Sequence, residues 1–204
     1  TVPTLNDAVV EGDETVVVTL GSVTAGDPQI AVGTPTSATG TITDNDSATV
    51  SIGGTPSVTE GGDLTFTVTL SAASSTATTV SYSFGGTATG GSDYDDSTTS
   101  VTIAANATTA TITVPTMDDG TVEGDETVEV TLGSVTAGNP QITVGTPASA
   151  TGTVTDNDTA TVSISGTPSV TEGGDLEFTV TLSAASSTDT SVSYSFGGTA
   201  IGGS

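Results

Sequence analysis

The chain has 204 residues, and its 24 Asp and Glu residues face no Lys, Arg or His, which gives a formal net charge of −24. Without basic side chains it cannot neutralise phosphates, so nucleic-acid binding and direct binding to anionic membranes are disfavoured. The chain has no Cys, which excludes disulfides and thiolate chemistry. Clustered carboxylates must then be solvated, protonated or neutralised by metal ions, so cations are the expected partners.

The chain repeats itself with a period of 112 residues, the separation of Asp44 from Asp156. About five in six of the overlapping positions are identical, which predicts a tandem array. Residues 1–46 are expected to be the carboxy-terminal part of one repeat, residues 47–158 a complete repeat, and residues 159–204 the amino-terminal part of the next. Because both ends fall inside a repeat, we expect the array to be longer than this chain.

Within the complete repeat, apolar residues alternate with Thr, which is the two-residue period of strands with one buried face. Turns rich in Gly, Asn, Asp and Pro separate these runs, and no stretch has helical periodicity. The fold class predicted is all-β, an antiparallel sandwich of seven strands per repeat. The predicted strands are Thr49–Ile52 continuing after a break to Val58, then Leu64–Leu70, Thr79–Phe84, Ser100–Ile103, Ala110–Val114, Thr127–Leu132 and Ala150–Thr155.

Two connections in this repeat carry expectations of their own. The segment Ala104–Thr108 is predicted to be a hairpin loop between two strands. Residues 133–147 form the longest connection, and either a surface loop or an irregular strand edge would account for them. Between repeats there is almost no linker, because a strand is expected directly after Asp158, so the relative orientation of the repeats depends on what sits at the junction.

Acidic residues gather in loops that are far apart in the sequence. In a sandwich the turns alternate between two ends, so several of these loops can converge on one end, where Ca²⁺ would find the six to eight or so oxygen ligands it takes. The alternative is that they are solvated turn residues, because Asp favours turns. The acidic positions in these loops are Glu60, then Asp93, Asp95 and Asp96, then Asp118, Asp119, Glu123, Asp125 and Glu126, and finally Asp156 and Asp158.

Five separated motifs follow one another along the repeat: Ser57–Gly62, Gly86–Ala88, Gly91–Tyr94, the segment from Asp118 to Glu126, and Thr153–Asp158. In their order and spacing they resemble the Calx-β domain. The resemblance covers the whole repeat and, through the repetition, the whole chain. It implies tandem seven-stranded, immunoglobulin-like sandwiches in a linear array, as known from sodium/calcium exchangers, an integrin cytoplasmic region and bacterial surface proteins.

The resemblance also implies Ca²⁺ as the bound ion and a set of carboxylate ligands. In the complete repeat these are Glu60, Asp93, Asp118, Asp119, Glu123, Glu126, Asp156 and Asp158. The repetition places Asp7, Glu11, Glu14, Asp44 and Asp46 at the matching positions of the preceding repeat and Glu172 in the following one. The neutral Asn157 stands where the exchanger type has an acid, which lowers the expected number of ions or their affinity.

Catalysis is not expected, because His, Cys and Lys are absent and only carboxylates and hydroxyls remain. A glycosidase based on paired carboxylates would need aromatic platforms, and aromatic residues make up 3% of the chain. The favoured function is a structural segment of an extracellular filament, stalk or adhesin shaft, secreted or at the cell surface and stiffened by Ca²⁺. Its partners would be calcium ions and neighbouring repeats of the same chain or of identical chains. The alternative is a calcium-sensing regulatory module of a larger protein.

Overall fold

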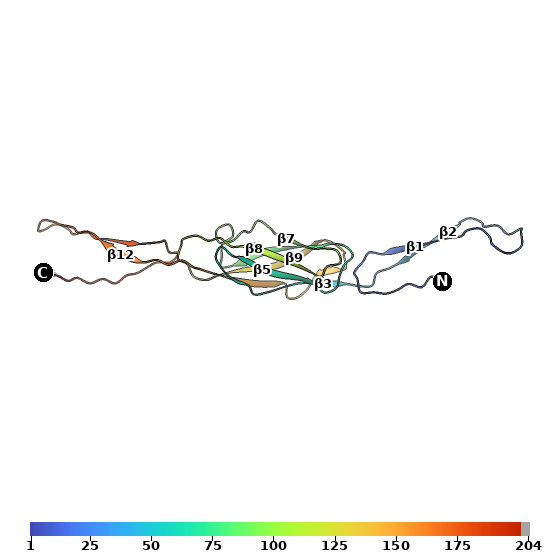
Figure 1. Ribbon diagram of the computed structural model, residues 1–204, viewed down its shortest axis with the longest axis horizontal. Helices are drawn as coiled ribbons and strands as arrows, with labels where there is room; N and C mark the ends of the chain where they lie inside the picture. The colour runs from blue at the N-terminus through green and yellow to red at the C-terminus, as the bar shows by residue number, and fades with distance from the viewer. Residues whose placement is uncertain (201–204) are drawn as a thin grey trace.

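The computed structural model describes residues 1–200, and all regular structure in that range is β-strand. A central sandwich lies between two extended, two-stranded segments that continue its long axis in opposite directions (Figure 1). The amino-terminal segment pairs β1 (Glu14–Thr19) with β2 (Ser37–Ile42), and the carboxy-terminal segment pairs β12 (Val162–Ser165) with β13 (Thr179–Leu182). In the described part of the chain, no helix is long and apolar enough to cross a bilayer.

The central sandwich consists of two sheets built from residues 48–155. In the first sheet the strand order is β10-β3-β5-β8, and in the second it is β4-β11-β9-β6-β7. The strands are β3 (Ala48–Gly53), β4 (Ser57–Thr59), β5 (Asp63–Leu70), β6 (Thr78–Gly86), β7 (Ser100–Ile103), β8 (Thr109–Pro115), β9 (Glu126–Ala137), β10 (Ile142–Val144) and β11 (Ser149–Thr155).

Alternation of apolar residues with Thr builds the core, as the sequence predicted. Along β5 every second residue is buried, and Leu64, Phe66 and Val68 are fully inaccessible. Val128 and Val130 of β9 bring the same pattern from the other sheet. The Thr residues between the apolar residues of β5 face solvent, so that outer face is polar without charge, whereas Glu129 lies between the two valines of β9. The all-β sandwich is therefore confirmed.

Three details differ from the expectations. The first predicted strand divides after Gly54, whose φ of +109° turns the chain so that β3 joins one sheet and β4 the other. The predicted hairpin at Ala104–Thr108 is wrong, because β7 pairs with β6 and β8 with β5, and the loop crosses between the sheets. Residues 133–147 are the irregular strand edge: β9 runs on to Ala137, and β10 pairs in parallel with β3.

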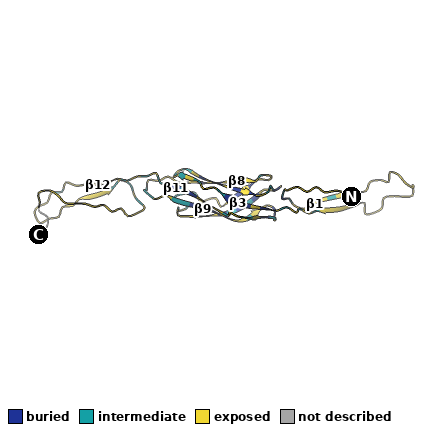
Figure 2. Ribbon diagram, turned by 90° about the horizontal axis from the view of Figure 1, so that it is seen from below, coloured by how far each residue is buried: buried dark blue, intermediate teal, exposed yellow. Residues whose placement is uncertain are grey.

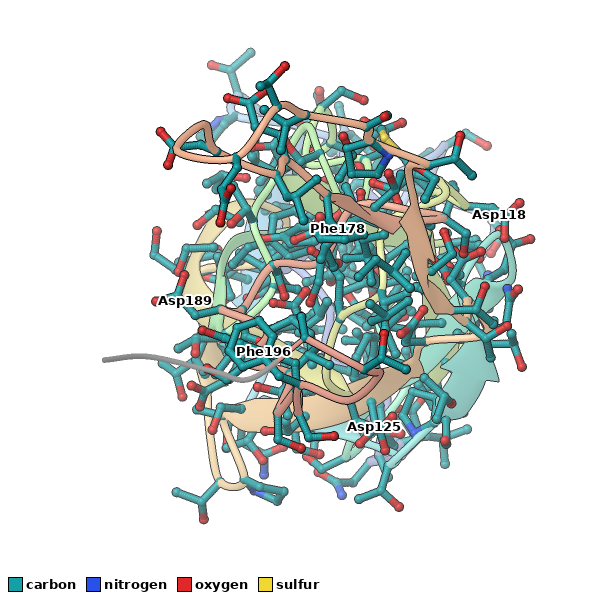
Figure 3. The ribbon with its side chains drawn as sticks, turned by 90° about the vertical axis from the view of Figure 1, so that its left-hand side faces the viewer. Asp118, Asp125, Phe178, Asp189 and Phe196 are labelled. Carbon is teal, nitrogen blue, oxygen red and sulfur yellow. The ribbon has the colours of Figure 1, made fainter. Side chains whose placement is uncertain are left out.

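Repeated sequences differ in burial between the central sandwich and the flanking segments (Figure 2). Phe66 is fully buried, whereas its counterpart Phe178 is 55% exposed. A view along the long axis from the carboxy-terminal side shows Phe178 and Phe196 in the flanking segment (Figure 3). In the described residues no second sheet covers the β12–β13 pair, so its apolar face has no packing partner.

Candidate metal centre

The sheet topology brings the ends of β4 and β11 to the same edge of the sandwich. These two strands run in parallel, with Thr59 opposite Thr155. Glu60 directly follows β4, and Asp156 directly follows β11. Because neighbouring parallel strands end at the same side of a sheet, their first loop residues emerge together. The backbone N–H of Glu60 donates to the Thr155 carbonyl at 3.1 Å, which continues the pairing into the loops.

The remaining carboxylates reach this edge through the antiparallel strands. Glu126 opens β9 and lies opposite Val154 of β11. The end of β6 pairs with β9 at the same edge, and the loop after β6 carries Asp93. That loop is anchored by Tyr94, which is 4% exposed and packs edge-to-face on Phe84 with ring centroids 5.2 Å apart. The Asp93 Oδ2 atom accepts a hydrogen bond from the Thr89 N–H at 2.6 Å.

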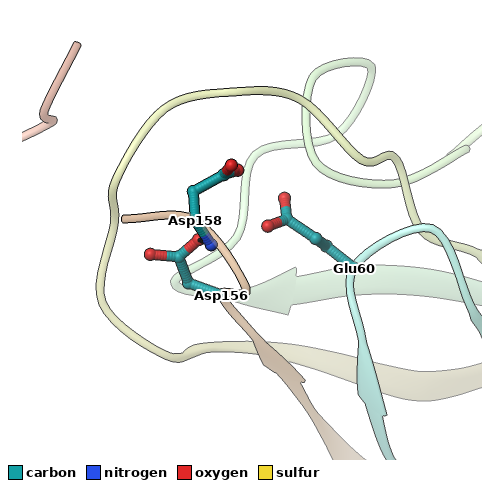
Figure 4. A group of neighbouring side chains, drawn as sticks. All are labelled: Glu60, Asp156 and Asp158. Carbon is teal, nitrogen blue, oxygen red and sulfur yellow. Dashed lines mark hydrogen bonds between the residues drawn. The ribbon is translucent and has the colours of Figure 1, made fainter. Parts of the chain in front are cut away.

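Three carboxylates form the first group: Glu60, Asp156 and Asp158 each offer an oxygen within 4.8 Å of the other two (Figure 4). The Asn157 N–H donates to Glu60 Oε1 at 3.1 Å, and the Asp158 N–H donates to Asp156 Oδ1 at 2.9 Å. Asp158 Oδ2 is buried and accepts no hydrogen bond from any of residues 1–200. A buried carboxylate oxygen without a donor is costly unless a cation or solvent satisfies it.

The second group consists of Asp93, Glu123 and Glu126, whose carboxylate oxygens also lie within 4.8 Å of one another. The Glu123 N–H donates to Asp156 Oδ2 at 2.7 Å, so the two groups adjoin. Five of the six acids, all but Asp158, line one hollow, whose lining is Glu60, Asp93, Met117, Asp119, Glu123, Gly124, Glu126, Val154 and Asp156. All charged side chains around it are acidic, and the donor atoms are hard oxygens of the kind Ca²⁺ prefers.

Proton affinities reflect this concentration of negative charge. Desolvation, the hydrogen bond to Asp93 and the charges of Asp93 and Glu123 raise the pKa of Glu126 to about 7. Desolvation and then the neighbouring acids also raise the pKa of Glu123. By contrast, the backbone N–H groups of Asp158 and Glu123 donate to Asp156 and lower its pKa.

Glu60 combines opposing effects. The Asn157 N–H stabilises its carboxylate and lowers the pKa, but desolvation and the nearby Asp156 outweigh that hydrogen bond, so the pKa of Glu60 is raised overall. Glu60, Glu123 and Glu126 thus all hold protons more tightly than usual in the metal-free protein. A divalent cation would relieve the repulsion that causes this, because it supplies the positive charge that the chain lacks.

Asp118 and Asp119 stand apart from the two groups. Both are exposed, and in the part of the chain that the structure describes neither belongs to a three-carboxylate group. Asp118 Oδ1 accepts a hydrogen bond from the Asn157 side-chain amide at 3.0 Å. Asp119 lines the hollow, and its Oδ1 accepts from the Thr121 N–H at 2.6 Å, which is a turn-forming contact.

The matching acids of the preceding repeat keep part of this arrangement. The Glu11 N–H donates to Asp44 Oδ2 at 2.7 Å, and the Asp46 N–H donates to Asp44 Oδ1 at 3.0 Å, as in the central repeat. Asp7 and Glu14 are exposed, although both contribute with Asp44 and Asp46 to the raised pKa of Glu11, after desolvation. Glu172 is exposed, and none of these six acids belongs to a three-carboxylate group among residues 1–200.

Sequence reasoning overlooked neutral residues that organise the acids. The sequence predicts that Asn157 only replaces an acidic ligand, yet its backbone N–H bonds Glu60 and its side-chain amide bonds Asp118. Asn139 and Gln141 of the central repeat contact the acidic end of the preceding repeat. The position of Asn157 between Asp156 and Asp158 could have indicated its role. By contrast, nothing in the local sequence of Asn139 indicates its contact with the Glu11 carbonyl.

Comparisons with known proteins agree with this arrangement. The Calx-beta domain family matches residues 1–46 and 55–158. No curated protein matches the sequence. Similar solved structures include the apo form of the Calx CBD1 domain, at 23% identity and a TM-score of 0.46, covering 54% of this chain and 99% of that one.

Two further similar structures contain the CBD12 segment. CBD12 from CALX1.2 is 22% identical, with a TM-score of 0.46, and the alignment covers 53% of this chain and 46% of that one. The calcium binding domain CBD12 of CALX1.1 is 22% identical, with a TM-score of 0.47, and the alignment covers 53% of this chain and 44% of that one. The match therefore spans less than half of either CBD12 chain. Because the family match extends over more than half of the present sequence, the chain belongs to the Calx-beta domain family.

Proposed function

We propose that the chain is a segment of a secreted or surface-attached array of Calx-β repeats, in which Ca²⁺ at the acidic end of each repeat stiffens the junction with the next. Calx-β domains are Ca²⁺-binding regulatory modules, and one similar solved structure is named as a calcium binding domain. The observation that carries the proposal is the position of the carboxylates: they lie at the end of the sandwich from which the following repeat begins.

The two carboxylate groups suit Ca²⁺ in their donor chemistry. Glu60, Asp156 and Asp158 would hold one ion, and Asp93, Glu123 and Glu126 a second. Asp158 Oδ2 is a buried carboxylate oxygen with no hydrogen-bond donor among residues 1–200, and a cation would satisfy it. When bound, the ion supplies the positive charge that the chain lacks and draws the separate loops together.

The junction is short enough for such an ion to matter. Asp158 is followed at once by Thr159, and β12 begins at Val162. A bound ion would restrain the angle between neighbouring repeats, because opening the junction would separate the loops that ligate it. The close identity of the repeats further supports a shaft, since a shaft needs length whereas a sensor needs few copies. The absence of Lys and Arg supports an exterior location, because trypsin-like proteases find no cleavage site.

Small-angle X-ray scattering of an array of several repeats tests the proposal. In millimolar Ca²⁺ we expect a rod, and in excess chelator a flexible chain of folded beads with a smaller maximum dimension. Circular dichroism in both conditions checks that the beads stay folded. A maximum dimension that does not respond to Ca²⁺ would contradict junction stiffening and favour a calcium-sensing regulatory module, provided that calorimetry still detects Ca²⁺ binding.

A further inference from the structure

One valine of the amino-terminal segment is buried inside the central repeat. Val10 is fully inaccessible and belongs to the same core cluster as Phe66. It forms a parallel β-bridge with Ser74, which lies in the loop between β5 and β6. Its N–H donates to the Ala73 carbonyl at 2.9 Å, and its carbonyl accepts from the Ser75 N–H at 3.1 Å. The Ser74 hydroxyl, itself 1% exposed, donates to the same carbonyl at 3.1 Å.

The same backbone pairing recurs at the second junction, where Val122 is half-buried. Val122 bridges to Ser186, donates from its N–H to the Ala185 carbonyl at 2.9 Å, and accepts from the Ser187 N–H at 3.1 Å. Val122 stands where Val10 stands in the preceding repeat, one residue before the acid Glu123. Two junctions in one chain therefore have the same backbone geometry, so the contact belongs to the repeat and is not peculiar to one place.

A second set of contacts closes over the first junction from the following repeat. Asn139, in the loop between β9 and β10, is 8% exposed, and its side-chain amide donates to the Glu11 carbonyl. Its Oδ1 accepts from the Gln141 N–H at 2.9 Å, which fixes the orientation of the amide. The Gln141 side-chain amide lies against Asp44, with its nitrogen 3.3 Å from the carbonyl oxygen in one orientation and 3.1 Å from Oδ2 in the other.

We propose that these contacts form an inter-repeat latch: the loop before each acidic glutamate is a docking element whose partner is the following repeat of the same chain. The partner is recognised by an apolar pocket for the valine, by backbone pairing with the loop at Ala73 to Ser75, and by the neutral amides of Asn139 and Gln141. The valine, Ala, Ser and Asn groups of the latch are uncharged, so it needs no ion to form. Without Ca²⁺ the repeats stay docked but bend about this contact, and the ion restrains that bending. The inference therefore goes beyond the proposed calcium-stiffened junction.

The latch has a consequence for the acidic end itself. Glu11 directly follows Val10, and its N–H donates to Asp44 Oδ2. With the Glu11 carbonyl held by Asn139, both backbone polar groups of this residue are fixed, one by its own repeat and one by the next. The following repeat thus completes the loop that carries the first acid of the site. A repeat at the end of an array, with nothing docked on it, would lack this support.

Amide hydrogen exchange on the full chain tests the latch, with and without chelator. We expect the N–H groups of Val10 and Ser75 to be protected in both conditions, as buried hydrogen-bonded amides are. The variant Asn139→Asp keeps the acceptor for the Gln141 N–H but places an oxygen against the Glu11 carbonyl. It should reduce the protection of Val10 by roughly tenfold, the equivalent of one lost buried hydrogen bond.

The chain offers controls within the same measurement. The amides of Val122 and Ser187, at the second junction, should not change in Asn139→Asp, and the β5 amides report whether the sandwich is intact. Ala77→Asp is the matched charge control, because it adds one carboxylate at an exposed position where the following repeat carries Asp189. Unprotected Val10 and Ser75 amides in the unaltered protein would overturn the latch. Protection of these amides only in Ca²⁺ would also overturn the latch, because docking would then be a by-product of ion binding. If the amides are protected but Ca²⁺ has no effect on the scattering of the array, only the proposed function is overturned.

Discussion

Removing Ca²⁺ should lower the stability of the central repeat by an amount that the site geometry sets. Two adjoining three-carboxylate groups offer places for two ions. Each ion that binds only the folded state contributes about 2.7 kcal/mol when free Ca²⁺ is about 100 times its dissociation constant. Two independent sites therefore give about 5 kcal/mol. For a repeat of this size that corresponds to a change in Tm of roughly 15–25 °C.

Differential scanning calorimetry of the chain in Ca²⁺ and in excess chelator measures this shift. Asp158→Asn should remove about half of it, because the change takes one charge from the first group, whose Asp158 Oδ2 lacks a hydrogen bond. Asp189→Asn removes the same charge from an exposed position outside the hollow and should leave the shift unchanged. Identical melting curves with and without Ca²⁺ would refute the metal site, and equal effects of the two variants would show that only total charge matters.

Three further predictions concern single positions. Asp119→Asn should weaken Ca²⁺ binding in titration calorimetry yet leave the metal-free Tm equal or higher, because the amide oxygen can still accept from Thr121; a lower metal-free Tm would assign Asp119 to the turn alone. Because the folded-state pKa of Glu126 is raised to about 7 from 4.5, the metal-free protein should lose stability as pH rises from 4.5 through 7. In urea titrations Glu126→Gln should flatten this dependence of the unfolding free energy on pH, and an unchanged dependence would contradict its assignment to Glu126. Gly86→Ala should lower the free energy of unfolding by more than about 2 kcal/mol in the same assay, since φ is +110° and a Cβ would meet the Thr127 carbonyl. Gly12→Ala, with open space around it, should not have this effect, and equal urea midpoints for the two variants would contradict the strain at Gly86.

The local pattern of the sequence was sufficient for the strands and for the class of fold. The alternation in Leu64–Leu70 specifies a strand with one buried face wherever it is placed, because side-chain direction alternates along any strand. The repeat period also follows from sequence alone. Pairing was harder to predict: Ala104–Thr108 has the composition of a hairpin loop, yet β7 and β8 belong to different sheets. Loop composition reports that the chain turns, and it does not report which strand each flank pairs with.

For the candidate site, too, the sequence determined one part and the tertiary structure another. Sequence identified the acidic loops, because carboxylates without any basic partner imply a cation. Only the tertiary structure decided which acids meet. The parallel pairing of β4 with β11 joins Glu60 to Asp156, while Asp118 lies outside both groups found in residues 1–200 and contacts the Asn157 amide. The carboxylate set as a Ca²⁺ ligand set remains a prediction that the experiments above address.

The junction between repeats depended on tertiary structure most of all. From the sequence, the near absence of a linker predicted that the orientation of neighbouring repeats depends on the junction, but no pattern singled out Val10. Its burial depends on Ser74, and the Glu11 carbonyl depends on Asn139, which lies 128 positions away along the chain. Local sequence determines the conformation that a short segment prefers, whereas contacts over such separations exist only once both sheets and the neighbouring repeat have formed. That is why composition and periodicity determined the fold class and the need for a cation, and why the folded chain alone decided which residues meet.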